Sequence, residues 1–379
     1  MEQKGYKKRL DDKNNTIMIT YNSIEDKNRF LQQCQIITSE ELWAFVGHCK
    51  ENKNLVFRGV NEAKYMGFSS AQVRTKASLS QNAYVAMISE AIQSVRGSEK
   101  IMNYIRSCSK DESDFQILAL LQHYGCGTPV IDYSTDIDKA LFFATDRQEN
   151  PIQTASKEDN SINAFISIYY FDKRDSDHAS LQEIHSRESA KLNYLDEEAR
   201  REYGALYKGV SDETKNSFKQ LPFKEFAELT GGGLFSVSGH SDGIIKFDIV
   251  GEQVEYNIDN ERIDAQDGLL MFNALSQTPY EEAAYNWYSA IKDKNYCVNI
   301  HKSLEGEIKS YLEKRCVTCK TIYPQTKESR IITEELMNLP MDERLKPNPV
   351  RCGKEKCVIK CCLKKFWLFC RSQFLHLKG

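Results

Sequence analysis

The chain has 379 residues, of which 41% are hydrophobic and 28% charged, and its formal net charge is −3. These values are typical of a globular protein with one large or two small domains, and they argue against a broadly basic nucleic-acid-binding surface. No apolar run approaches the roughly 20 residues of a membrane-spanning helix, and the N-terminus has no apolar segment typical of a secretion signal. The twelve cysteines are therefore expected to be reduced thiols of a cytoplasmic protein.

The N-terminal part leads into a predicted core strand. Residues 1–37 form a polar leader, in which the alternating piece at 16–21 is predicted to be an edge strand. A capping-box sequence at Thr38–Glu41 begins a helix that is expected to end near Cys49. Residues 55–59, which begin with the apolar Leu55, Val56 and Phe57, then predict the first core strand.

The middle of the chain contains several predicted helices, one of which breaks at a glycine. Residues 80–106 are predicted to be mostly helical, and a second helix begins at Phe115 and breaks at Gly125. The β-branched pair Val130-Ile131 leads into a polar segment and then into a buried helix that ends near Ala144. The cap of this helix is predicted to be one of three residues, Ser134, Thr135 or Asp136.

The second half alternates between strands and helices. Residues 147–162 are loop-like, and the aromatic and β-branched run at 164–171 is the strongest strand signal in the chain. Residues 175–230 are charged and are predicted to form a helical insertion. Further strands are predicted at 234–238, 243–250, 254–258, 269–272 and 296–300, and helices at 279–291 and 302–314.

Four sequence blocks resemble a known family. Residues 121–125 read Leu-Gln-His-Tyr-Gly, and a threonine-proline turn, an Asp-Tyr-Ser segment at 132–134 and Ala-Leu-Phe-Phe-Ala at 140–144 follow. This pattern is similar to the signature of FRG-domain proteins, and Phe57-Arg58-Gly59 supplies the motif that names the family. Blocks at 262–272 and 300–324 follow in family order, so the resemblance covers residues 42–325.

Arg58 and Gly59 lie at the end of the predicted strand. Arginine is well suited to bidentate recognition of phosphate or carboxylate, and a glycine lets a ligand approach the backbone closely. Alternatively, Arg58 holds a buried carboxylate such as Asp132. The sequence leaves both interpretations open.

The order of the motifs is also similar to that of arginine-dependent mono-ADP-ribosyltransferases. That resemblance implies that Arg58 holds the phosphates of NAD, that residues 132–134 replace the family's Ser-Thr-Ser motif, and that Gln266 stands near the catalytic glutamate. Cleavage of the nicotinamide–ribose bond passes through an oxocarbenium-like state, which a nearby anion stabilises. The predicted catalytic residues are His123, Asp132 and Gln266, and the predicted NAD-binding residues are Arg58, Gly59, Gln122, Tyr124, Tyr133 and Ser134.

Gln266 departs from the transferase pattern because its amide carries no charge. Asp132, Asp264 or Asp267 is a possible substitute for the missing carboxylate, but the sequence does not place any of them near the reacting atoms. Alternatively, residues 266–268 form only a tight turn between strands.

The cysteines and the C-terminal tail raise separate hypotheses. Cys316 and Cys319 have zinc-knuckle spacing, and the tail offers Cys352 and Cys357, but the second pair lacks clean Cys-x-x-Cys spacing and zinc is not expected. Residues 351–379 contain eight Lys or Arg and one Glu, a local charge of 8 − 1 = +7. Weak contact of this tail with nucleic acid or an anionic membrane surface is therefore an open alternative.

The sequence thus predicts an α+β fold, with a central mixed or antiparallel sheet flanked by helices. One main domain is expected at residues 38–330, with the insertion at 175–230 and a basic Cys-rich tail at 331–379. The leading function is an ADP-ribosyltransferase-like enzyme or NAD-consuming effector. The alternatives are a non-enzymatic module that senses a nucleotide or phosphate ligand, and an effector directed to nucleic acid by its tail.

Overall fold

The structure is a computed structural model. It describes residues 6–10, 16–75, 79–109, 112–146, 156–172, 222–224, 227, 234–239, 244–249, 252–257, 260–282 and 294–347. The predicted insertion lies almost wholly outside these residues, as does the tail from residue 348 onwards, so the predictions for both segments stay predictions.

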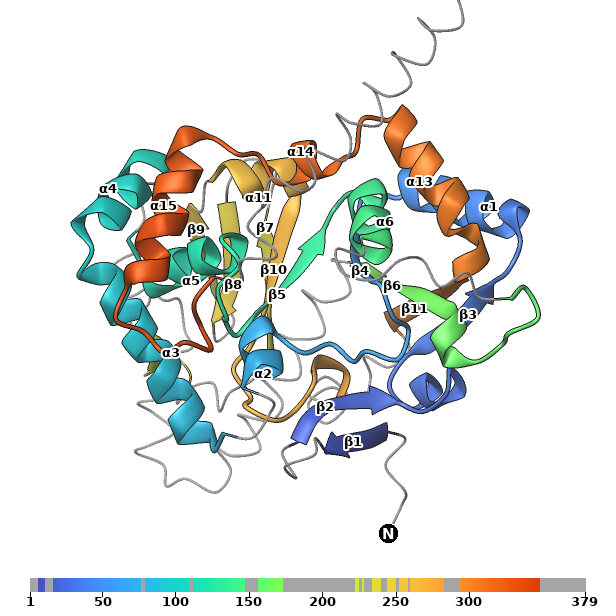
Figure 1. The fold of residues 1–379 in the computed structure, drawn as a ribbon, viewed down its shortest axis with the longest axis horizontal. Helices are drawn as coiled ribbons and strands as arrows, with labels where there is room; N and C mark the ends of the chain where they lie inside the picture. The colour runs from blue at the N-terminus through green and yellow to red at the C-terminus, as the bar shows by residue number, and fades with distance from the viewer. Residues whose placement is uncertain are drawn as a thin grey trace, which may run out of the picture.

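A nine-stranded mixed sheet forms the centre of the molecule (Figure 1). Its strand order is β3-β11-β6-β4-β5-β10-β7-β8-β9, and every neighbouring pair is antiparallel except the parallel pair β3 and β11. The strands are β3 (Gln32–Ile36), β4 (Leu55–Val60), β5 (Val130–Ser134), β6 (Phe165–Asp172), β7 (Leu234–Gly239), β8 (Ile244–Ile249), β9 (Glu252–Asn257), β10 (Gly268–Asn273) and β11 (Asn295–His301). The predicted α+β class is confirmed.

The predicted edge strand at 16–21 is confirmed as β2 (Thr16–Tyr21). It pairs with β1 (Tyr6–Leu10) in a separate two-stranded sheet. Tyr21, at its end, is bonded through its backbone N–H to the carbonyl of Lys64, which fastens the small sheet to the loop after β4.

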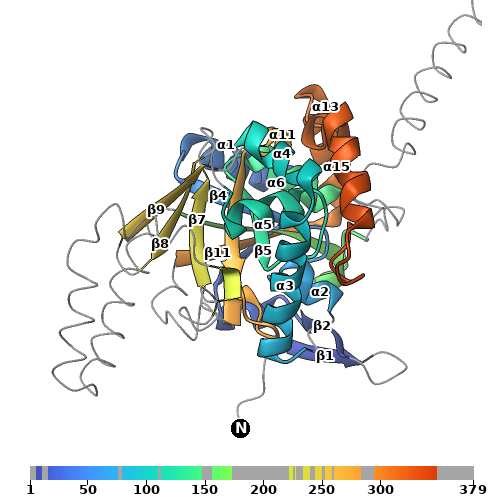
Figure 2. The ribbon, with the colours of Figure 1, turned by 90° about the vertical axis from the view of Figure 1, so that its left-hand side faces the viewer.

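Two groups of helices pack on the sheet, one on each side of β5 in Figure 1. One group buries its apolar side chains in a cluster with β4, β6 and β11, and the other packs around the central helix α5. The first group is α1 (Ser39–Glu51), α6 (Ile137–Thr145) and α13 (Glu305–Lys314), and the second is α3 (Gln81–Arg96), α4 (Glu99–Cys108), α5 (Asp114–His123) and α15 (Lys327–Asn338). Figure 2 shows β7, β8 and β9 extending away from these helices.

Most of the predicted elements are confirmed, because their signals are local. The Thr38 capping box starts α1: the Thr38 side chain accepts from the Glu41 N–H, and the Glu41 carboxylate accepts from the Thr38 N–H. The prediction that residues 80–106 are mostly helical is confirmed. They form two helices, because the Ser98 side chain accepts from the Ile101 N–H and caps a new helix.

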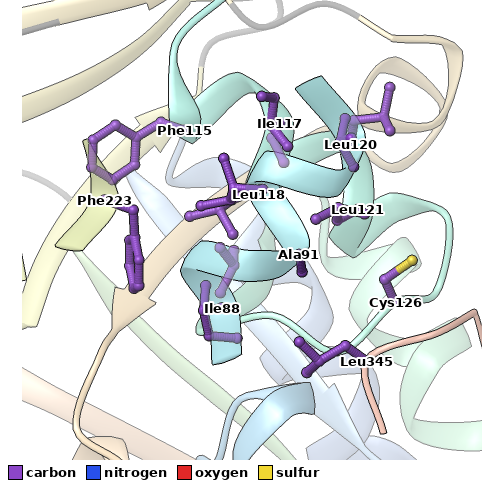
Figure 3. Close-up of a cluster of buried hydrophobic side chains, with 14 of the residues drawn as sticks. Ile88, Ala91, Phe115, Ile117, Leu118, Leu120, Leu121, Cys126, Phe223 and Leu345 are labelled. Carbon is purple, nitrogen blue, oxygen red and sulfur yellow. The ribbon is translucent and has the colours of Figure 1, made fainter. Parts of the chain in front are cut away.

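The core extends beyond the predicted end of the domain. The expected boundary at residue 330 falls inside α15, and Ile332 and Leu336 are buried in the cluster around α5. Leu345 is also fully buried, and its carbonyl accepts from the Gly127 N–H at 2.8 Å. Figure 3 shows Leu345 beside Cys126 and Ala91. Residues 331–347 therefore belong to the folded core and not to the tail.

Candidate functional site

Three motifs that are distant in the sequence lie in one row across the sheet. Phe57 on β4 is the register partner of Ser134 on β5, and Ser134 is the partner of Gly268 on β10. The Phe-Arg-Gly, Asp-Tyr-Ser and Gln-Asp-Gly motifs therefore meet on three adjacent strands. This row defines the candidate site.

Arg58 bridges the place where β4 and β5 separate. The register of these strands contains one pair, Phe57 with Ser134, so they diverge at once. The Arg58 guanidinium Nη1 donates to the backbone carbonyl of Asp132 at 2.8 Å, while its Nε is buried with no hydrogen-bond partner among the described residues. The alternative prediction that Arg58 binds the Asp132 carboxylate is corrected, because Arg58 contacts the carbonyl.

Gly59 packs against a helix. A Cβ at this position would lie 2.7 Å from the Ala144 backbone N and closer still to the Ala140 carbonyl oxygen, both on α6. The space that a side chain would take is therefore filled by helix backbone. Gly59 allows the close approach of α6 to β4, and the predicted approach of a ligand at this point is not available.

Gln122 and Asp132 form a buried polar pair at the end of α5. The Gln122 Nε2 donates to the Asp132 Oδ2 at 2.6 Å, and the Gln122 Oε1 accepts from the Ser70 hydroxyl at 2.9 Å and from the Thr128 hydroxyl. These contacts fix the orientation of the amide. The second carboxylate oxygen, Asp132 Oδ1, is buried without a partner among the described residues, and an unsatisfied buried carboxylate oxygen is costly.

His123 is a buried imidazole. Burial lowers the pKa of His123 to about 4; the nearby Asp132 carboxylate opposes this effect, and Arg262 adds to it. Its Nε2 has no hydrogen-bond partner among the described residues, and its Cε1 lies 3.5 Å from the point where a Cβ on Gly268 would be. His123 is therefore neutral at pH 7, placed beside the start of β10.

Arg262 opens one of the family-like blocks, but no motif in the sequence predicts a role for it. It lies on α11 (Glu261–Gln266), is 2% exposed, and donates from Nη1 to the His123 carbonyl at 2.7 Å. Its guanidinium also lies over the Tyr124 ring, 4.5 Å from the centroid. Tyr124 is fully buried among the helices and donates to the Tyr104 hydroxyl at 3.1 Å, so it faces away from the row.

Ser134 and Gln266 clamp β5 to the end of α11. The Ser134 hydroxyl donates to the Gln266 carbonyl at 2.7 Å and accepts from the Asp136 N–H at 3.1 Å. The Gln266 side chain donates from Nε2 to the Ile322 carbonyl at 3.3 Å. The motif at 266–268 is not a tight turn between two strands: Gln266 ends α11, Asp267 adopts a left-handed conformation with φ of 43°, and Gly268 begins β10.

The predicted site residues divide between the two faces of the sheet. Successive strand residues point to opposite faces. Val56, Ile131 and Tyr133 belong to a cluster with Phe171 on one face, while Leu55 and Phe57 pack against α1 and α6 on the other. Arg58 and Tyr133 therefore share the face away from the helices. Asp132 and Ser134 lie on the helix-covered face, where Gln122 and His123 meet them.

The cysteine and membrane hypotheses concern other parts of the chain. Cys316 is exposed and Cys319 half-buried, whereas Cys352 and Cys357 are outside the described residues. Within the described ranges, no group of three or more His, Cys, Asp or Glu side chains is placed to hold a metal ion. Every helix in that part of the chain is too short or too polar to cross a bilayer.

Comparison with known proteins identifies one domain. No curated protein and no solved structure matches the chain. The family model of the FRG domain matches residues 53–153, a span that begins before β4 and includes α5, β5 and α6. The chain therefore contains an FRG domain, at residues 53–153.

Proposed function

We propose that the FRG domain binds NAD or a related nucleotide and acts as an ADP-ribosyltransferase-like, NAD-consuming enzyme. The observation that carries this proposal is the row formed by Phe57, Ser134 and Gly268, which brings three motifs to one end of three adjacent strands. A reaction on a dinucleotide needs groups for phosphate, ribose and the developing cation within a short distance. The row supplies candidates for each, with Arg58 on one face of the sheet and His123 and Asp132 on the other, and the Arg58 guanidinium is bonded to the carbonyl of Asp132 between them.

Arg58 is the phosphate-binding group in this proposal. Its Nη1 is fixed on the Asp132 carbonyl, which orients the guanidinium, and its Nε has no hydrogen-bond acceptor in the part of the chain that the structure describes. A planar guanidinium with a fixed orientation binds phosphate bidentately. The ligand would lie where β4 and β5 diverge.

His123 and Asp132 are the polar groups for the sugar. A neutral imidazole exchanges hydrogen bonds with hydroxyl groups, and its unpartnered Nε2 is the atom that would do so. The Asp132 Oδ1, which has no donor among the described residues, can accept a hydroxyl hydrogen bond, and the carboxylate's negative charge would stabilise an oxocarbenium-like state. Ser134 and Gln266 hold the backbone around these groups, because their side chains already bond backbone carbonyls.

A non-enzymatic sensor is the second candidate, and it is favoured by the charges near residue 266. The Gln266 side chain is uncharged, and the neighbouring Asp267 carboxylate is paired with the Lys139 ammonium. If no carboxylate reaches the scissile bond, the same groups bind a nucleotide without cleaving it.

The test is nicotinamide release from NAD by the purified protein. We expect Arg58→Ala to abolish release. Arg58→Lys should lower it about 10- to 100-fold, because lysine keeps the positive charge but lacks the planar guanidinium with its paired N–H donors. Arg330→Lys, on the exposed side of α15, is the matched control and should leave release unchanged. Unchanged release in Arg58→Ala would contradict the proposal.

A sensor gives a different result in the same preparation. Without turnover, a nucleotide at a hundredfold its dissociation constant should stabilise the wild-type protein by about 2.7 kcal/mol. Arg58→Ala should remove this stabilisation. If NAD gives neither nicotinamide release nor stabilisation, both candidates are excluded for NAD.

A further inference from the structure

The end of α5 that carries His123 is held by an arginine from another element. The last turn of an α-helix leaves four backbone carbonyls without a partner inside the helix. In α5, three of these carbonyls accept from the backbone N–H groups of the turn that follows, at residues 124–126. The fourth is the His123 carbonyl, which accepts from the Arg262 Nη1 at 2.7 Å. Arg262 therefore completes the C-terminal cap of α5.

The Arg262 side chain is held at both of its ends. Arg262 is 2% exposed, and its guanidinium lies 4.5 Å from the centroid of the Tyr124 ring, whose hydroxyl donates to Tyr104 at 3.1 Å. The Arg262 backbone N–H donates to the Asn260 Oδ1 at 3.0 Å, in the N-cap of α11. Backbone and guanidinium are thus both fixed, and Nη1 has a defined position from which it bonds α5.

Helix α11 fastens both elements that carry the polar groups of the site. Arg262 bonds the end of α5, and the Gln266 carbonyl at the other end of α11 accepts from the Ser134 hydroxyl of β5 at 2.7 Å. The His123 Cε1 lies 3.5 Å from the point where a Cβ on Gly268 would be, so the ring packs where β10 begins. The position of His123 relative to β5 and β10 therefore depends on this short helix.

We propose that Arg262 is a positioning residue of the candidate site, which acts on His123 from α11 and holds the end of α5 against Asp132. The Gln122 Nε2, one residue before His123, donates to the Asp132 Oδ2 at 2.6 Å, so a displaced helix end would also change the contacts of this carboxylate. The inference rests on the proposed function and deepens it, because His123 and Asp132 are the groups assigned to the sugar. Arg262 itself is buried and acts without touching the ligand.

The charge of Arg262 also acts on the His123 imidazole. The carbonyls at the C-terminus of a helix carry partial negative charge, which favours a protonated histidine there. Burial is the main cause that lowers the pKa of His123; the Asp132 carboxylate of β5 raises it, and the Arg262 guanidinium lowers it. Strand β10, against which the ring packs at Gly268, has no ionisable side chain. A neutral side chain at position 262 would therefore remove the positive charge that opposes Asp132 and the helix end.

Titration of the His123 ring by NMR tests this role, with the signal identified by its absence from His123→Gln. In the wild-type protein the ring should remain neutral down to about pH 4. We expect the pKa of His123 to rise by about one unit in Arg262→Gln, which loses the charge, and to stay near the wild-type value in Arg262→Lys, which keeps it. The same titration in Arg262→Gln as in the wild type, or the same rise in both variants, would overturn the proposal.

Arg96→Gln is the matched control, because Arg96 holds the opposite end of α5. Its Nε and Nη2 donate to the Asp114 Oδ1 at 3.1 and 2.6 Å. This substitution should lower the free energy of unfolding and leave the His123 titration unchanged. An equal rise would show that any loosening of α5 exposes the ring, and would reject a specific role of Arg262. If Arg262→Gln does not fold, Arg262→Met, whose apolar chain still packs on Tyr124, takes its place with the same expected rise.

The release assay separates this inference from the proposed function. If the protein releases nicotinamide from NAD, Arg262→Gln should lower kcat about tenfold and leave KM within about twofold, because Arg58 lies on the other face of the sheet and keeps its place. A rise in the His123 pKa in Arg262→Gln, with no release by the wild-type protein, would support the positioning role and reject the enzyme. Wild-type kcat and an unchanged His123 titration in Arg262→Gln would support the enzyme and reject the positioning role.

Discussion

Replacing Gly59 with alanine is expected to lower the free energy of unfolding by about 4 kcal/mol or more. The new Cβ would lie 2.7 Å from the Ala144 backbone N, and closer to the Ala140 carbonyl oxygen. Both atoms belong to helix backbone and not to a flexible side chain, so the clash is relieved only if α6 moves away from β4. That movement would also open the apolar cluster to which Ala140 and Leu141 belong.

Urea denaturation of the variant and of a matched glycine variant measures this effect. Gly47 lies exposed in α1 with no atom within 4 Å of a Cβ placed on it. Gly47→Ala should therefore stabilise the protein by about 0.5 to 1 kcal/mol, as glycine is unfavourable inside a helix. If both variants changed stability by the same amount, the close packing of α6 on β4 would not be the reason for the glycine of the Phe-Arg-Gly motif.

The sequence predicted the elements whose signals are contained within a few residues. The Thr38 capping box, the alternating piece at 16–21 and the aromatic run at 164–171 each specify their structure locally, and each was found where expected. The strand ending in Phe57-Arg58-Gly59 was also predicted. The FRG domain was recognised for the same reason, because its motifs are short and ordered.

The features that the sequence did not show depend on the pairing of strands that are far apart in the chain. Nothing local indicates that Gly268 pairs with Ser134, or that Arg58 and Asp132 lie on opposite faces of the sheet. In the sequence Arg262 only opens a family-like block, yet in the fold it is buried and donates to the His123 carbonyl. Glu281 was one of two adjacent glutamates in a predicted helix, and only the fold places it on Gly67 and near Arg58.

The depressed pKa of His123 predicts a loss of stability at acid pH. Histidine in an unfolded chain takes up a proton near pH 6.5, whereas in the folded protein the pKa of His123 is about 4. Between these values the unfolded state binds more protons than the folded state, so acidification favours unfolding. The stability is fully present above pH 6.5 and is lost as the pH falls to about 4, by about 3 kcal/mol in total.

Urea denaturation at a series of pH values, for wild type and for His123→Gln, isolates this contribution. Carboxylates titrate in both proteins, so their effects cancel in the difference between the two free energies of unfolding. A pH-independent effect of the substitution changes the free energy of unfolding by the same amount at every pH and leaves the slope of the curve unchanged. We expect the wild type to lose about 3 kcal/mol more than the variant between pH 7 and pH 4. Parallel curves would show that His123 is solvated and charged like an ordinary histidine.

The same measurement decides what His123 can do in the candidate site. An imidazole with a pKa of about 4 has no proton to give at pH 7 beyond that of its neutral N–H, so it is a hydrogen-bonding group and a poor general acid. Any activity that depends on it should then show no inflection near pH 6.5. An inflection there, together with parallel denaturation curves, would instead assign His123 to proton transfer and leave Asp132 as the group that binds the sugar.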